Sequence, residues 1–100
     1  MLEWYLEHGY DLVERNWRCR AGEIDLIVSR PDVVVFCEVK TRSSNAFGGP
    51  FAAVGAAKQA RIRTLALEWL AANPSRRRRR LRFDVAGVIA GRVEVIESAF

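Results

Sequence analysis

The sequence predicts a single α/β domain whose elements follow the order α-β-β-β-α-β-β. Its 100 residues suit one small domain, and no internal repeat divides the range 1–100. Several segments of strand length alternate apolar and polar residues, whereas one long segment repeats apolar residues with the period of a helix. These features together favour strands and helices in one domain.

The first half of the chain predicts a short helix followed by three antiparallel strands. Met1 to His8 carries apolar residues at helical spacing and stops at Gly9, a residue that suits the end of a helix. Strand-like alternation follows in three segments, Tyr10 to Arg20, Glu23 to Ser29 and Val33 to Lys40. Short turns separate these segments, so neighbouring strands should run in opposite directions.

The second half predicts a loop, the main helix and two further strands. Thr41 to Pro50 is rich in Ser, Asn, Gly and Pro, which indicates a loop. The main helix should span Ala52 to Ala72 and end at Asn73-Pro74, and strands should follow over Leu81 to Ala90 and Arg92 to Glu97. The helical stripe comprises Val54, Ala57, Ile62, Leu65, Ala66, Trp69 and Leu70.

The positive charge of the chain is concentrated in a basic loop predicted over residues 73–80. Six arginines between Arg76 and Arg82 exceed the net charge of +4, so the remaining residues are acidic on balance. Such a run is either a solvated loop or an electrostatic footprint for phosphates. In the second case Arg76, Arg77 and Arg78 would bind nucleic acid.

Neither a membrane segment nor a disulfide framework is expected. No apolar run approaches the roughly 18–20 residues of a membrane span, and the amino terminus lacks the order of a signal peptide. Cys19 and Cys37 have no metal-binding spacing, so we expect buried free thiols. These features predict a cytoplasmic protein without a membrane partner.

Four charged residues interrupt the second and third strands. A turn centred on Pro31-Asp32 would place Glu23 opposite Lys40 and Asp25 opposite Glu38, all on one face. The other face would then be wholly apolar, with Ile24, Leu26 and Val28 opposite Val39, Cys37 and Val35. A slip of one residue would scatter the charges into the core, so the apolar pattern favours this register.

The charged cluster suggests a metal site because opposed acids need a nearby cation. Asp25 and Glu38, with a backbone carbonyl and waters, would form the oxygen site that Mg²⁺ accepts. Lys40 could orient the attacking water or stabilise charge on a phosphate, and Arg42 could hold a neighbouring phosphate. The alternative is a salt-bridge ladder on a solvated sheet, with the missing charge supplied by Arg15, Arg18 or Arg20.

The remainder of the charged face argues against a fully solvated sheet. Ile27, Val34 and Phe36 make that part apolar, so we expect the main helix to cover half of the face. Partly desolvated acids are costlier to leave unpaired than exposed ones.

An Asp followed by Glu-x-Lys on the next strand, here GEIDLI and then FCEVKTR, resembles the signature of the PD-(D/E)XK nuclease superfamily. Over essentially the whole chain, the sequence is similar to the YraN-like family of small bacterial proteins. The segments that carry this similarity are YLEHGYDLVERNWRCRAGEIDLI, VVVFCEVKTR, FGGP, VGAAKQARI, RFDV and SAF. The resemblance implies a restriction-endonuclease-like fold, a central mixed β-sheet flanked by helices, as in Holliday-junction resolvases.

The resemblance also implies hydrolysis of phosphodiesters, dependent on Mg²⁺ or Mn²⁺, in DNA rather than RNA and in branched DNA in particular. Asp25 and Glu38 would be metal ligands, Lys40 the catalytic lysine and Glu23 a supporting acid. Analogy with resolvases suggests a homodimer.

Four further residues fall near family motif positions or on the main helix. Lys58 and Arg61 lie one helical turn apart and would either bind phosphate or remain solvated charges. Arg82 and Asp84 alternate with apolar residues on a strand, which favours a structural ion pair.

One family feature is expected to be missing. Family members carry Gly-Glu on the first helix, several residues before the equivalents of Tyr5-Leu6, and here that position would precede Met1. We therefore expect a truncated first helix without this acid. The sequence keeps a second function open, a catalytically inactive nucleic-acid-binding module of the same fold.

Overall fold

The structure is a computed structural model that describes residues 1–41, 55–76, 79–89 and 91–100. Five strands form one mixed sheet in the order β1-β2-β3-β4-β5. The elements in chain order are α1 (Leu2–Glu7), β1 (Asp11–Cys19), β2 (Gly22–Arg30), β3 (Val33–Thr41), α2 (Ala56–Ala72), the 3₁₀-helix η3 (Pro74–Arg76), β4 (Arg80–Ile89) and β5 (Arg92–Ile96). The predicted α/β fold and its element order are confirmed.

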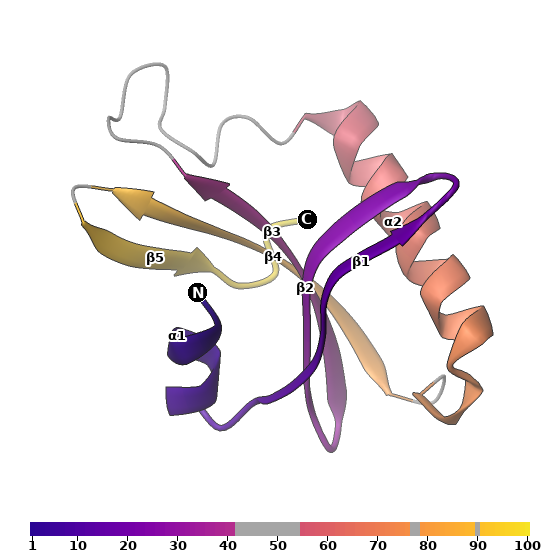
Figure 1. Cartoon of the computed structure of the whole chain (residues 1–100), viewed down its shortest axis with the longest axis horizontal. Coiled ribbons are helices and arrows are strands. Elements are labelled where there is room, and N and C mark those ends of the chain that lie inside the picture. Colours follow the sequence, from indigo (N-terminus) through magenta and orange to yellow (C-terminus); the bar gives the residue numbers. More distant parts are fainter. Residues whose placement is uncertain (42–54, 77–78, 90) are drawn as a thin grey trace.

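The sheet is mixed because α2 lies between β3 and β4 along the chain. β3 pairs with β4 in parallel, whereas the other neighbouring strands are antiparallel. A crossover through a helix is the usual way to connect parallel strands, since a tight turn can only reverse the chain. The two α-helices lie on opposite sides of the sheet (Figure 1). α1 therefore covers one face and α2 the other.

The face under α1 carries one of the two apolar layers of the core. Tyr5 from α1 is fully buried on the sheet and packs edge-on against Tyr10. The strand residues of this layer are Leu26, Val28, Val33, Val35, Cys37 and Ala86. At about 25 cal/mol per Å² of apolar surface removed from water, this layer and its counterpart supply most of the favourable folding energy.

The face under α2 holds the second apolar layer. Trp69 is fully buried and meets Phe36 edge-on, with ring centroids 5.7 Å apart. Other members of this layer are Ile24, Ile27, Val34, Leu65, Ala66 and Leu70. The prediction that the main helix covers Phe36 is confirmed.

The predicted register of β2 and β3 holds only in the half of each strand that adjoins the turn between them. Pairing runs from Arg30 and Val33 to Leu26 and Cys37 and stops there. Beyond that point the β1–β2 hairpin bends away from β3 toward α2 (Figure 1). The prediction that Ile24 joins the Leu26 face was therefore wrong, because the bend buries Ile24 in the α2 layer.

The tip of the hairpin approaches α2 closely at Gly22. Its φ of +145° is a backbone conformation that residues with a Cβ rarely adopt, and a Cβ there would lie 3.5 Å from Leu65. Glycine thus allows the turn that directs the hairpin toward the helix.

Some predictions concern residues outside the described ranges. These are most of the loop Thr41 to Pro50, the first three residues predicted for the main helix, and Val54 of its stripe. Ala57 was wrongly placed on the apolar stripe, since it is exposed in the first turn of α2, whereas the stripe from Ile62 onward is buried. Both cysteines are free thiols, but only Cys37 is buried as predicted, since Cys19 is partly exposed. No helix in the described ranges has the length and apolar character to cross a membrane.

Candidate metal and nucleic-acid site

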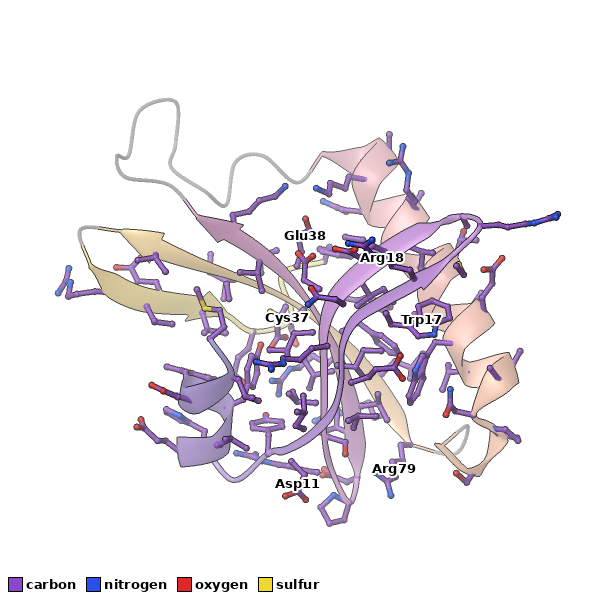
Figure 2. All side chains as sticks on the ribbon, viewed as in Figure 1. Asp11, Trp17, Arg18, Cys37, Glu38 and Arg79 are labelled. Atoms are coloured by element: carbon purple, nitrogen blue, oxygen red, sulfur yellow. The ribbon has the colours of Figure 1, made fainter. Side chains whose placement is uncertain are left out.

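Glu38 is the centre of a charged cluster where β3 meets the first turn of α2. Its side chain is buried, and its Oε1 atom contacts the Nζ of Lys58 at 2.7 Å and the Nζ of Lys40 at 3.2 Å. Residues 34, 36, 38 and 40 alternate onto the α2 face of β3, so the strand itself brings Glu38 and Lys40 there. In Figure 2 Glu38 lies above Cys37, toward the upper side of the view where α2 begins.

Asp25 approaches the same site from β2 through the gap that opens between the strands. Its Oδ2 accepts a hydrogen bond of 2.9 Å from the Val39 backbone N–H. The carboxylate therefore bridges the two strands where their backbone pairing has ended. The prediction that Asp25 pairs directly with Glu38 across the two strands was therefore wrong. Both acids nevertheless line the same pocket.

That pocket has a volume of about 240 Å³ and lies between the β1–β2 hairpin, β3 and α2. Its charged lining comprises Glu23, Asp25, Glu38, Lys58 and Arg61. Five of the predicted site residues therefore line one pocket, and a sixth, Lys40, contacts it through Glu38. We refer to this pocket below as the acidic pocket.

Glu23 pairs with Arg18 rather than with Lys40. Arg18 and Glu23 are register partners on β1 and β2, and the Arg18 Nε donates to Glu23 Oε2. The prediction that Glu23 faces Lys40 was wrong, because the bent hairpin carries Glu23 away from β3. For Glu23 the alternative of a salt bridge to the first strand is thus the one observed.

The protonation of the cluster reflects its burial and its crowded charges. Burial raises the pKa of Asp25, the Val39 N–H opposes this rise, and the negative charges of Glu38 and Glu23 add to it. Contact with Lys58, followed by burial, lowers the pKa of Lys40, while the bond to Glu38 raises the pKa of Lys58. Shifted acids and bases gathered in one pocket are typical of functional sites.

Arg79 and Arg80, two described arginines of the run, lie away from this site (Figure 2). Val33 pairs with Arg80 and Lys40 with Gly87, so β4 begins at the end of β3 that is remote from Glu38. At about 3.3 Å per residue, Val33 and Glu38 are roughly 16 Å apart along the strand. Figure 2 shows Arg79 and Glu38 at opposite ends of the sheet. Of the predicted phosphate-binding residues, Arg42, Arg77, Arg78 and the side chain of Arg76 lie outside what the structure describes.

Arg82 and Asp84 form the predicted structural ion pair. Arg82 Nε lies 2.9 Å from Asp84 Oδ1 and Nη2 lies 2.9 Å from Oδ2. Asp84 is fully buried on the α1 face, where Tyr5 donates to it at 2.7 Å. This pair belongs to the α1 layer and is separated from Glu38 by the sheet.

Sequence reasoning missed a second opening beside Asp25. A pocket of about 350 Å³ on the α1 side is lined by Asp25, Arg15, Asn16 and the start of α1. Asp25 can therefore be approached from both faces of the sheet. Nothing in the local pattern indicates this, because it depends on where β2 and β3 separate.

The Asp25 carboxylate should reduce stability at neutral pH, so Asp25→Asn should stabilise the metal-free protein. Asparagine keeps an oxygen for the Val39 N–H and removes the charge that lies close to two other acids. The gain expected at pH 7 is below about 1 kcal/mol, because solvent screens a partly exposed carboxylate, and it corresponds to less than about 4–8 °C in melting temperature. Thermal melts with a chelator present would measure it.

The gain should depend on pH in a defined direction. Because the folded-state pKa of Asp25 lies above its unfolded value of about 4, the wild-type penalty is absent below that value and grows as pH rises through the folded pKa. The gain should therefore vanish in acid. Asp11→Asn makes the same change at an exposed position and should show no gain. Equal melting temperatures for wild type and Asp25→Asn at pH 7 would contradict the prediction.

Comparison with known proteins finds one family model and several relatives that all carry the same family name. The family model described as "Uncharacterised protein family UPF0102" matches residues 1–88. A UPF0102 protein of Clavibacter michiganensis is 50% identical over 96 residues, which cover 91% of this chain and 80% of the relative. One from Rhodococcus opacus is 46% identical over 99 residues, 94% of this chain and 83% of the relative. One from Streptomyces griseus is 49% identical over 86 residues, which cover 86% of this chain and 72% of the relative.

Proposed function

Since the chain belongs to the bacterial UPF0102 family, whose name states no activity, we propose a function from its acidic pocket. The protein hydrolyses phosphodiester bonds in DNA, including branched DNA, with Mg²⁺ or Mn²⁺ as cofactor. The observation that carries this proposal is the meeting of Asp25 and Glu38, from two strands, with Lys40 beside Glu38. That arrangement agrees with the activity implied by the resemblance to PD-(D/E)XK nucleases.

The donor set of the pocket fits a small divalent cation. Asp25 and Glu38 offer hard carboxylate oxygens, and burial above all, together with the nearby acids Glu38 and Glu23, raises the pKa of Asp25. Within the described ranges, no three His, Cys, Asp or Glu side chains cluster as ligands. Mg²⁺ is commonly held by one or two protein carboxylates and keeps several waters, so two acids are sufficient. When bound, the ion would lower the pKa of a water and stabilise charge on the phosphate.

The remaining residues have roles that follow from their contacts. Lys40, held beside Glu38 on β3, would orient the attacking water and stabilise negative charge that develops on the phosphate. Arg61 is exposed on the α2 side of the pocket and would bind a neighbouring phosphate of the DNA. Glu23, fixed by Arg18, would support the position of Asp25.

A catalytically inactive nucleic-acid-binding module is the second candidate. The observation that favours it is the charge balance at Glu38, where two lysines already satisfy one carboxylate oxygen. Such a cluster is also found as a structural ion-pair network. The two candidates differ in whether the protein binds a divalent metal and cleaves DNA.

Cleavage assays on duplex, single-stranded and four-way-junction DNA with Mn²⁺ would test the proposal. We expect metal-dependent cleavage by the wild type and none by Asp25→Asn/Glu38→Gln, which removes both proposed ligands. The matched control is Glu7→Gln/Asp11→Asn, which changes the same two residue types at exposed positions and should cleave normally.

Other outcomes would favour other functions. DNA binding at low salt without cleavage, and without calorimetric metal binding that the double variant abolishes, would favour the inactive module. Absence of DNA binding at low salt would contradict both candidates and would favour a protein-interaction module.

A further inference from the structure

Lys58 occupies an unfavourable position in its own helix. α2 begins at Ala56 after the N-cap Gly55, so Lys58 lies in the first turn, which contains no acidic residue. The amino end of a helix carries partial positive charge, and a cation there costs a few tenths of a kcal/mol or more. The bond to Glu38 offsets this cost, since the carboxylate accepts from Lys58 at 2.7 Å. A residue that breaks a local preference in this way often serves the site it contacts.

Two ammonium groups share one oxygen of Glu38, and either would suffice to neutralise it. Lys40 is two residues from Glu38 on the same strand, whereas Lys58 comes from another element. Asp25 and Glu38 together carry two negative charges, and Lys40 and Lys58 carry two positive charges. The lysines therefore already supply the +2 charge that a divalent ion would bring. An added ion would leave uncompensated positive charge in a partly buried pocket unless one lysine moved away.

Of the two lysines, Lys58 is the one whose side chain can move away from Glu38 into solvent. Its side chain is 35% exposed, compared with 18% for Lys40. Its four-carbon stem is flexible, and hydration of the released ammonium compensates for loss of the ion pair. Lys40, in contrast, is held in the sheet close to Glu38 by the strand that carries both residues.

We propose that Lys58 is a displaceable counter-cation, which occupies Glu38 Oε1 in the metal-free protein and must release this oxygen before a divalent metal binds. The inference rests on the proposed metal site and concerns a positioning residue that controls the availability of Glu38. Metal binding then competes with an internal ion pair, and the apparent affinity falls in proportion to the fraction of molecules in which Glu38 is free.

Calorimetric titration of the metal-free protein with Mn²⁺ would test this directly. Lys58→Met removes the competing cation while keeping a helix-forming side chain of similar length, and it leaves Glu38 paired with Lys40. We expect it to bind Mn²⁺ about tenfold or more tightly than the wild type. Lys58→Gln provides a second uncharged variant, with the same expectation.

Two controls separate displacement from a general change in charge. Arg61→Met removes one positive charge from the same helix and the same pocket, but Arg61 has no ion pair with Glu38 among the described residues, so affinity should change no more than about threefold. Lys58→Arg keeps a cation and should stay close to the wild type. A structural role for Lys58 would lower the melting temperature of Lys58→Met without this gain in affinity.

The outcomes distinguish this inference from the proposed function. Mn²⁺ affinity of Lys58→Met equal to that of Arg61→Met, with clear binding by the wild type, would overturn the displacement and leave the metal site intact. Absence of Mn²⁺ binding in every protein, Lys58→Met included, would overturn the metal site and the displacement together. Binding by Lys58→Met alone would support the displacement strongly.

Discussion

Lys40→Ala should reduce metal-dependent DNA cleavage by about 10²–10³-fold while it leaves the fold and metal binding in place. Lys40 is the basic group that β3 itself holds next to Glu38, at 3.2 Å. In the metal-free protein, contact with Lys58 and then burial lower the pKa of Lys40. Glu38 remains paired with Lys58 at 2.7 Å, so the variant does not create an unpaired buried acid.

Single-turnover cleavage rates, with calorimetric Mn²⁺ binding measured in parallel, would check this prediction. Arg92→Ala is a suitable control, because Arg92 is exposed at the start of β5 and does not line the acidic pocket. It should cleave at nearly the wild-type rate. Unchanged cleavage by Lys40→Ala would remove Lys40 from the reaction, whereas loss of metal binding would assign it to the metal site instead.

The sequence predicted the parts of the sheet in which apolar alternation is uninterrupted. From Leu26 to Val28 and from Val35 to Cys37, one face is apolar throughout and a slip would expose it, so the register was determined. At Glu23 and Asp25, the alternation of apolar and polar residues no longer determines how β2 pairs with β3. The structure resolves the conflict by separating the strands, burying Ile24 under α2 and bridging the gap with Asp25.

Contacts between distant elements were harder to predict. The proximity of Lys58 to Glu38 depends on how α2 packs over β3, and helical periodicity says only which side of α2 faces inward. The direction of β4 was more accessible, since a crossover helix implies parallel strands, and parallel strands begin at the same edge of a sheet. That rule places Arg80 far from Lys40 and so separates Arg80 from the acidic pocket.

Asp84→Ala should lower the free energy of unfolding by about 3–5 kcal/mol, the usual cost of breaking a buried charge pair. Asp84 is fully buried and accepts hydrogen bonds from Tyr5, Arg82 and the Ser98 N–H. Its loss would leave the Arg82 guanidinium, whose side chain is only 10% exposed, with the half-exposed Glu97 as its remaining acidic partner among the described residues. A small domain has about 5–15 kcal/mol of total stability, so much of it would be lost.

Urea unfolding of a graded set would test whether the cost arises from the buried charge. Glu97→Gln weakens only the outer contact of Arg82 and should cost less than about 1 kcal/mol, whereas Tyr5→Phe removes one hydrogen bond and should cost about 1–1.5 kcal/mol. A loss for Asp84→Ala no greater than that for Glu97→Gln would contradict the prediction. Because Asp84 faces α1 and Glu38 faces α2, Tyr5→Phe should lose stability and still cleave DNA at the wild-type rate. This result would assign the α1 face of the sheet to stability and the α2 face to the proposed chemistry.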